Sequence, residues 1–146
     1  MCITISEMKV EDYEKVAALW RAAAGIGLDD DVDSQEGIAA YLARNPGFSR
    51  VARHGNRIVA AVLCGHDGRR GYLHHLAVAV EWRKKGIGRS LVAAGLKKLA
   101  SVGIPKCNIF LFADNALGEA FWKHTGWSGR ADLKVLQRQC SLENGR

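Results

Sequence analysis

Apolar residues recur at helical spacing in two segments near the start of the chain. A short run at residues 3–6 predicts a first strand, and residues 11–24 predict an amphipathic helix. Ser34 is a favourable N-cap residue and predicts the start of a second, shorter helix that ends at Asn45-Pro46-Gly47. The apolar side chains expected to face the core from these two helices are Val16, Ala17, Leu19, Trp20, Ile38, Tyr41 and Leu42.

The middle of the chain changes to the pattern of β-strands. Residues 48–53 and 57–64 flank His54-Gly55-Asn56, which predicts an antiparallel hairpin, and residues 72–80 predict a further strand. Because side chains alternate along a strand, the two adjacent histidines of this segment are expected on opposite faces and not to act as a pair. The alternation places on one face Tyr72, His74, Leu76 and Val78, and on the other Leu73, His75, Ala77 and Ala79.

The second half of the chain alternates between helix and strand. Residues 88–102 predict the longest helix, and residues 106–112 are almost fully apolar, which is typical of a strand buried on both faces. A last helix is expected to begin at Asn115 as N-cap and to end at Gly126, followed by a closing strand at residues 133–139. The apolar stripe expected on the longest helix consists of Leu91, Val92, Leu96, Leu99 and Val102.

Length and composition fit a globular protein with one core. The chain has 146 residues, of which 48% are hydrophobic and 25% charged. We expect a single domain over residues 1–140 and a C-terminal tail at residues 141–146. The order of elements predicts an α/β protein whose mixed, mostly antiparallel central sheet is flanked by about four helices.

The spacing of the cysteines and the hydropathy of the chain predict where the protein is located. The four cysteines lack the spacing of a disulfide framework or a zinc site. Neither a basic leader nor a run of about eighteen apolar residues occurs, so we expect a cytoplasmic protein that does not bind membranes. Cys64 and His66 share a strand face, but without further ligands at matching spacing no metal site is expected.

The most informative segment follows the strand at residues 72–80. It is a basic, glycine-punctuated turn that leads directly into the longest helix, Arg83-Lys84-Lys85-Gly86-Ile87-Gly88-Arg89. A helix N-terminus carries unpaired N–H groups and about half a positive charge, and glycines let an anion approach it. The turn therefore predicts a pyrophosphate site. It is not a Walker loop, because no G-x-x-x-x-G-K-[ST] sequence occurs in the chain. It is not a dinucleotide fingerprint, because Leu91 stands where the third glycine of the fingerprint belongs.

The net charge supports the same interpretation. The formal charge of +6 is compatible with nucleic-acid binding, but the basic residues cluster only at Arg69-Arg70 and around the glycine turn. An anionic cofactor explains such a local cluster better than a nucleic-acid backbone does. We therefore expect no nucleic-acid partner.

The turn resembles motif A of the GCN5-related N-acetyltransferase (GNAT) superfamily, whose R/Q-x-x-G-x-G/A sequence holds the pyrophosphate of acetyl-CoA. Residues 115–127 resemble motif B, N-x-x-A-x-x-F/L-Y-x-x-x-G-F, at the expected distance downstream. The resemblance covers essentially the whole chain. It implies the acyl-CoA N-acyltransferase fold, with a sheet splayed at the cofactor site, in a short bacterial member that moves the acetyl group of acetyl-CoA to a primary amine by direct transfer in a ternary complex.

The resemblance also implies which residues hold acetyl-CoA. Main-chain amides of residues 76–78 would bind the pantetheine arm and polarise the thioester carbonyl, and Asn115 would act as N-cap, cofactor ligand or both. The residues expected to bind the cofactor are Leu76, Ala77, Val78, Arg83, Lys84, Lys85, Gly86, Ile87, Gly88, Arg89, Asn115 and Trp122.

The chemistry needs a base, because an alkyl amine with a pKa of about 10.4 is mostly protonated at pH 7. Tyr72 occupies the position where many family members carry a glutamate base, and His74 matches a strand histidine of the arylalkylamine N-acetyltransferases. His74 is the candidate base, with a packing role as the alternative, and Tyr72 is expected beside it in the catalytic site. The tyrosine that usually protonates the leaving thiolate is replaced by Trp122, whose indole cannot act as an acid.

The acceptor side offers one further pattern. Five carboxylates lie in the segment that forms one wall of the acceptor cleft in this family, and they would attract a cationic amine unless they are only solvated. They are Asp29, Asp30, Asp31, Asp33 and Glu36. Two other functions remain open, a non-catalytic acyl-CoA-binding or regulatory domain of the same fold and a nucleic-acid-binding module. A homodimer is also left open.

Overall fold

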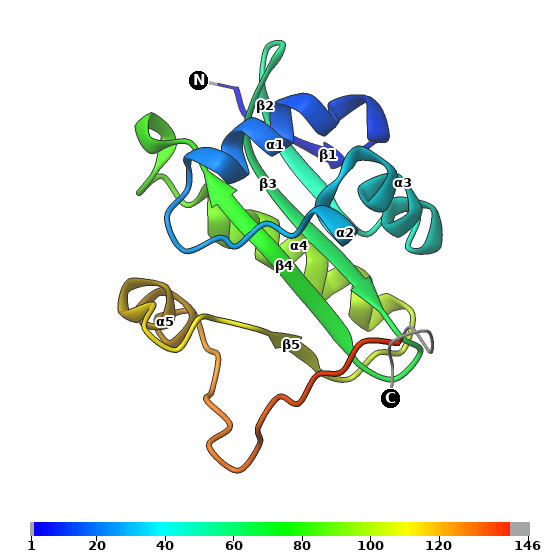
Figure 1. Ribbon diagram of the computed structural model, residues 1–146. Coiled ribbons are helices and arrows are strands. Elements are labelled where there is room, and N and C mark those ends of the chain that lie inside the picture. The colour runs from blue at the N-terminus through cyan, green and yellow to red at the C-terminus, as the bar shows by residue number, and fades with distance from the viewer. Residues whose placement is uncertain (1, 141–146) are drawn as a thin grey trace. The chain divides into compact units, whose positions relative to one another are not determined.

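The computed structural model describes residues 2–140 (Figure 1). The chain forms two compact units, one that ends at Asn115 and one that begins at Ala116. The second unit contains a single helix, α5 (Ala116–His124), among its described residues. The first unit contains, in order, β1 (Thr4–Glu7), a short 3-10 helix η1 (Val10–Asp12), α1 (Tyr13–Ala22), α2 (Asp30–Asp33), α3 (Gln35–Arg44), β2 (Arg50–His54), β3 (Arg57–His66), β4 (Gly71–Val78), a 3-10 helix η2 (Val80–Trp82), α4 (Ile87–Ser101) and β5 (Cys107–Ile109).

The first unit is built on a five-stranded sheet in the order β1-β2-β3-β4-β5. The first four strands pair antiparallel, and β5 pairs parallel with β4, which confirms the predicted mixed, mostly antiparallel sheet. The ladder between β4 and β5 covers only Gly71–Leu73 and Cys107–Ile109. Beyond it the two strands separate (Figure 1). The sheet is therefore open between β4 and β5.

Helices cover both faces of this sheet. α1 and α3 lie on one face and bury Val16, Trp20 and Ile38 against it, and α4 lies on the other (Figure 1). The buried positions of α4 follow the i, i+4 spacing of a straight helix, so Leu96 and Val102, which were expected on the apolar stripe, are exposed instead. The buried residues of α4 are Ile87, Leu91, Val92, Gly95 and Leu99.

Local signals placed most elements of the first unit correctly. The Ser34 hydroxyl accepts a hydrogen bond from the Gly37 amide at 3.1 Å, which confirms Ser34 as the N-cap of α3. Gly55 has a φ of +60° in the predicted hairpin between β2 and β3. The acidic run before Ser34, for which the sequence predicted no regular structure, forms the short helix α2 with Asp29 as its N-cap.

Two predicted strands differ from the structure. The apolar run at residues 106–112 pairs only as β5, and Phe110 is 60% exposed, so this run is not a strand buried on both faces. Residues 133–139 form no strand, and three of their apolar side chains are exposed. A strand needs a partner to satisfy its main-chain hydrogen bonds, and no strand of the described sheet pairs with these residues. The tail at residues 141–146 lies outside the described residues, and the single-domain boundary at residue 140 stays a prediction.

Candidate functional site

An extra residue interrupts β4 near its centre. The register pairs Leu63 of β3 with His74 but Ala61 with Ala77, so β4 is one residue longer than β3 between these pairs. The additional length is taken up at His75, which has a φ of +55°. This left-handed conformation is uncommon for a residue with a side chain.

The bulge changes which β4 side chains share a face. Tyr72 and His74 remain together as predicted, with nearly parallel rings whose centroids are 6.2 Å apart. Ala77 belongs to the core cluster under α1 and α3, on the same face as His74 although it is three residues further along. Leu76 and Val78 therefore lie on the opposite face. The prediction that they share a face with His74 is wrong, because one inserted residue inverts the alternation.

The two histidines of β4 are neighbours in space. Their ring centroids are 6.4 Å apart, so the prediction that they lie on opposite faces is also wrong. Nε2 of His75 lies 3.0 Å from Oδ1 of Asp33 in α2, and the His75 carbonyl accepts a hydrogen bond from Nε1 of Trp20 at 3.0 Å. Asp33 and Trp20 together hold both the ring and the main chain of this residue.

Aromatic side chains surround His74. The rings of Tyr72 and Phe110 lie alongside it at 6.2 and 6.3 Å, and Tyr41 of α3 meets it edge-on at 6.2 Å. Burial lowers the pKa of His74 below its ordinary value, and the positive charge of a protonated His75 would lower it further. Burial likewise raises the pKa of the Tyr41 phenol. The Asp33 carboxylate acts on the pKa of His74 in the opposite direction and raises it, but burial is the largest effect.

The acidic segment divides into buried and exposed carboxylates. Asp33 is buried, and its Oδ2 accepts a hydrogen bond from the Asp29 amide at 2.9 Å. Asp29 in turn accepts a hydrogen bond from the amide of Asp31 at 2.9 Å and so caps α2. The side chains of Asp33 and Asp29 thus hold the main chain of this segment through hydrogen bonds. The side chains of Asp29, Asp30, Asp31 and Glu36 are exposed and carry the negative charge of the segment to its surface.

The glycine turn caps the N-terminus of α4. Gly86 is the N-cap with a φ of +81°, and a Cβ added there would have no atom within 4 Å. Because glycine has no capping side chain, it leaves the first amides of α4 to a ligand. Gly88 lies inside the first turn of α4 and not in the left-handed region, so the expected freedom of φ applies to Gly86 alone. The exposed cationic side chains of this segment are Arg83, Lys84, Lys85 and Arg89.

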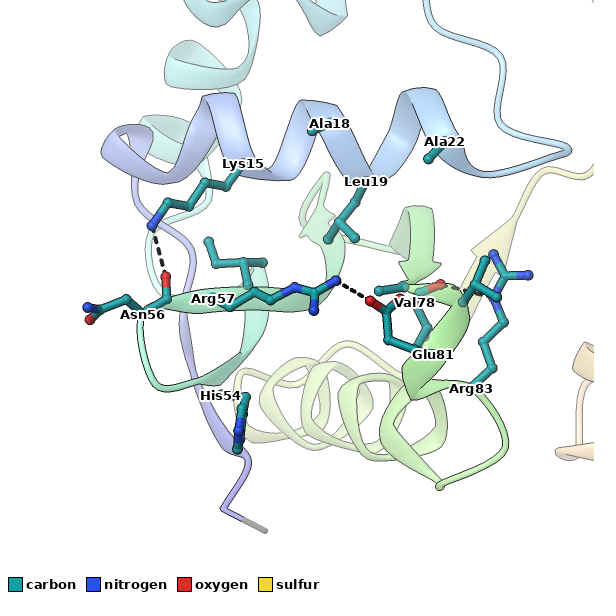
Figure 2. Close-up of a pocket in the computed structure, with 13 residues that line it drawn as sticks. Lys15, Ala18, Leu19, Ala22, His54, Asn56, Arg57, Val78, Glu81 and Arg83 are labelled. Atoms are coloured by element: carbon teal, nitrogen blue, oxygen red, sulfur yellow. Dashed lines mark hydrogen bonds and ion pairs between the residues drawn. The ribbon is translucent and has the colours of Figure 1, made fainter.

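Two cavities adjoin this turn. One of about 300 Å³ is lined by residues that include Lys85, Gly86 and Ser90. The other, of about 720 Å³, lies between α1 and the ends of β3 and β4 (Figure 2). Val78 and Arg83 line it, and Nε of Arg83 donates a hydrogen bond to the Val78 carbonyl at 3.0 Å (Figure 2). The larger cavity thus contains two of the residues predicted to bind the cofactor.

Asn115 lies against the loop that follows α1. Gly25 in this loop has a φ of +82°, and a Cβ there would stand 2.8 Å from Nδ2 of Asn115. A Cβ at Gly27 would likewise stand 2.6 Å from the Phe112 ring. Only glycine allows the loop to approach this closely. α5 begins at Ala116, directly after the predicted N-cap.

Trp122 belongs to the core of the second unit. Its buried ring meets Phe121 at 5.2 Å and Trp127 at 5.1 Å, both at steep angles. The Trp127 amide donates to the Trp122 carbonyl at 3.0 Å, and Gly126 ends the helix with a φ of +102°. A contact of Trp122 with the cofactor stays a prediction.

Sequence reasoning missed the pairing of His75 with Asp33 and the aromatic surroundings of His74. One signal was present. Leu73 and Leu76 are three residues apart in a strand whose apolar side chains should recur at even spacing, and such an interruption indicates a bulge.

No helix within residues 2–140 is long and apolar enough to cross a bilayer.

Comparison with known proteins gives consistent matches. A family model described as "Acetyltransferase (GNAT) family" matches residues 13–127. An acetyltransferase of Photorhabdus laumondii subsp. laumondii is 33% identical over 113 residues, 76% of each chain. PaiA N-acetyltransferase from Thermoplasma acidophilum, solved in complex with coenzyme A, has a TM-score of 0.78 at 20% identity and covers 88% of this chain and 91% of its own. An aminoglycoside acetyltransferase from an uncultured soil metagenomic sample, in complex with sisomicin, has a TM-score of 0.71 at 18% identity, over 96% of each chain. These two structural matches confirm the fold.

Proposed function

Because the chain belongs to the GNAT acetyltransferase family, we propose that it transfers the acetyl group of acetyl-CoA to a primary amine by direct transfer in a ternary complex. The observation that carries this proposal is the opening between β4 and β5 next to a bulge in β4, the strand that precedes the glycine-capped start of α4 in the chain. We also propose that the protein acts in the cytoplasm and binds no nucleic acid.

The cofactor side fits an extended, anionic thioester. The space at Gly86 and the uncapped amides of α4 suit a pyrophosphate, and the exposed cations around them supply opposite charge. The side chain of Ile87 is buried, so this residue would contribute its main chain alone. Acetyl-CoA, when bound, supplies the acetyl group as a thioester. Main-chain amides beside the bulge, at Leu76–Val78, would polarise its carbonyl.

The acceptor side fits a cationic amine. The exposed carboxylates of the α2 region would attract it electrostatically. Tyr72 and His74 would line the place where it loses its proton, next to Phe110. A thiol with a pKa of about 8.5 leaves as a fairly stable anion, so transfer does not depend on an acid at Trp122. The match to an aminoglycoside acetyltransferase supports a polyamine-like acceptor without naming one.

The decisive experiment follows thiol release from acetyl-CoA with a panel of amines. We expect turnover with at least one cationic primary amine and none with the matching N-acetylated compound, because acetylation removes the nucleophile. A parallel titration measures acetyl-CoA binding. Binding without thiol release from any amine would instead favour a non-catalytic acyl-CoA-binding domain, and binding to a DNA duplex alone would favour a nucleic-acid module.

A further inference from the structure

A carboxylate and an imidazole are paired at the bulge of β4. We propose that His75, held by Asp33, accepts the proton of the acceptor amine, and that Asp33 is its positioning residue. This inference rests on the acetyl transfer proposed above. It changes the assignment of the base, because the sequence favoured the neighbouring His74.

The geometry of the pair determines which ring nitrogen is basic. Oδ1 of Asp33 lies 3.0 Å from Nε2 of His75 and can only accept, so Nε2 carries the hydrogen and Nδ1 presents a lone pair. The carboxylate is held at its other oxygen by the Asp29 amide, and Tyr13 donates a hydrogen bond to the Asp33 carbonyl at 2.7 Å. A carboxylate fixed in this way orients the imidazole and places a negative charge beside it.

The degree of burial suits a base that exchanges protons with a substrate. The side chain of Asp33 is 7% exposed and that of His75 is 19% exposed. The carboxylate is thus shielded while part of the imidazole remains accessible. Oriented His–carboxylate pairs of this kind serve as general bases in unrelated enzymes because the carboxylate selects the tautomer.

The position of His75 places it beside the reacting group. It directly precedes the segment Leu76–Val78, whose amides are proposed to bind the thioester, and it is the residue that forms the bulge. Its carbonyl is held by Trp20, whose ring also meets the imidazole at 5.0 Å. A left-handed backbone costs about 1 kcal/mol or more outside glycine, and such conformations cluster at functional sites.

His74 lacks comparable support. Its neighbours are the rings of Tyr41, Tyr72 and Phe110, and within residues 2–140 no carboxylate is hydrogen-bonded to it. Its burial disfavours a positive charge. The titratable groups that face His75 are Asp33 on α2 and His74 on β4 itself. His74 therefore serves as an uncharged wall of the acceptor site.

The reaction balances with one base. The acceptor ammonium gives one proton to Nδ1 of His75, and its freed electron pair forms the bond to the thioester carbon. The carbon–sulfur bond breaks, and its electron pair leaves on the sulfur. The second amine proton ends on this sulfur as the coenzyme A thiol, and His75 returns its proton to solvent.

The test compares His75→Asn, Asp33→Asn and, as the matched control, His74→Gln. Asparagine tolerates the left-handed conformation at position 75, so the bulge can be kept. We expect His75→Asn to lower kcat by roughly 10²- to 10⁴-fold at pH 7, with the rate recovering at high pH where free amine accumulates. Acetyl-CoA affinity should stay within about threefold of the parent.

The Asp33→Asn variant supplies a readout that a structural role would not move. Removing the carboxylate disfavours the protonated imidazole, so the acid limb of the kcat profile should shift to lower pH. His74→Gln should leave this limb in place. A His75→Asn variant that folds and turns over like the parent at every pH would overturn the inference, as would a loss of the limb in His74→Gln alone. If His75→Asn fails to fold, the Asp33→Asn profile decides. A parent chain that acetylates no amine would overturn the proposed function as well.

Discussion

At the scale of single residues, two glycines at the ends of α4 have the same geometry and different expected roles. Gly86 and Gly103 have φ values of +81° and +85°, and a Cβ added to either would meet no atom within 4 Å. Gly103 only ends the helix, whereas Gly86 stands where a pyrophosphate is proposed. Substituting each glycine in turn therefore distinguishes the effect of backbone strain on stability from an effect on cofactor binding.

We expect Gly86→Ala and Gly103→Ala each to lower the free energy of unfolding by about 1 kcal/mol, because both force alanine into the left-handed region. Only Gly86→Ala should weaken acetyl-CoA binding, by roughly tenfold, which corresponds to about 1.4 kcal/mol. Denaturant unfolding and isothermal titration measure the two quantities. Equal acetyl-CoA affinities of the two variants would place the anion site elsewhere.

At the scale of elements, α4 holds the glycine turn against the sheet. Leu99 is buried and packs on Gly71 at the start of β4, where a Cβ would approach its Cδ1 to 2.5 Å. Leu96 lies one turn earlier on the same helix and is exposed. The two leucines thus have equal helix propensity and different burial.

Leu99→Ala should lower the free energy of unfolding by about 2 to 5 kcal/mol, because it removes a buried side chain and leaves a cavity over β4. Leu96→Ala should change it by about 0.5 kcal/mol or less, as is usual at the surface. Urea titrations of both variants provide the comparison. Similar losses in the two would show that α4 does not pack on the sheet through the Leu99 face.

At the scale of the whole molecule, the formal charge of +6 is distributed unevenly. Lys84 and Lys85 lie at the glycine turn, whereas Arg69 and Arg70 lie in the loop between β3 and β4. Neutralising either pair changes the net charge equally. The comparison therefore distinguishes a local anion site from a general attraction.

We expect the double variant Lys84→Gln/Lys85→Gln to weaken acetyl-CoA binding and to flatten its dependence on ionic strength, because fewer cations face the phosphates. The double variant Arg69→Gln/Arg70→Gln should retain the salt dependence of the parent. Binding titrations at low and at physiological ionic strength measure both. The local interpretation would be wrong if the two double variants lost affinity alike.

Much of the first unit follows from local patterns in the sequence. Ser34 capped a helix, Gly55 turned a hairpin, and the glycine turn led from β4 into α4, because capping, turn geometry and amphipathic spacing act over a few neighbouring residues. The same patterns, with the family resemblance, also indicate an acetyltransferase. The strand at residues 133–139 could not be judged in this way, because a strand exists only with a partner.

The tertiary structure alone decided the arrangement of side chains around the two histidines of β4, where the acceptor site is proposed. By itself the sequence determined most elements of the first unit, the basic glycine turn and the choice of family, but neither α2 nor the absence of a strand at residues 133–139. It did not determine that His75 turns to the side of His74, because a bulge depends on the register between β3 and β4. Nor did it show that Asp33, 42 residues earlier in the chain, meets that imidazole. Contacts between distant segments are set by how the helices pack on the sheet, and no local pattern encodes them.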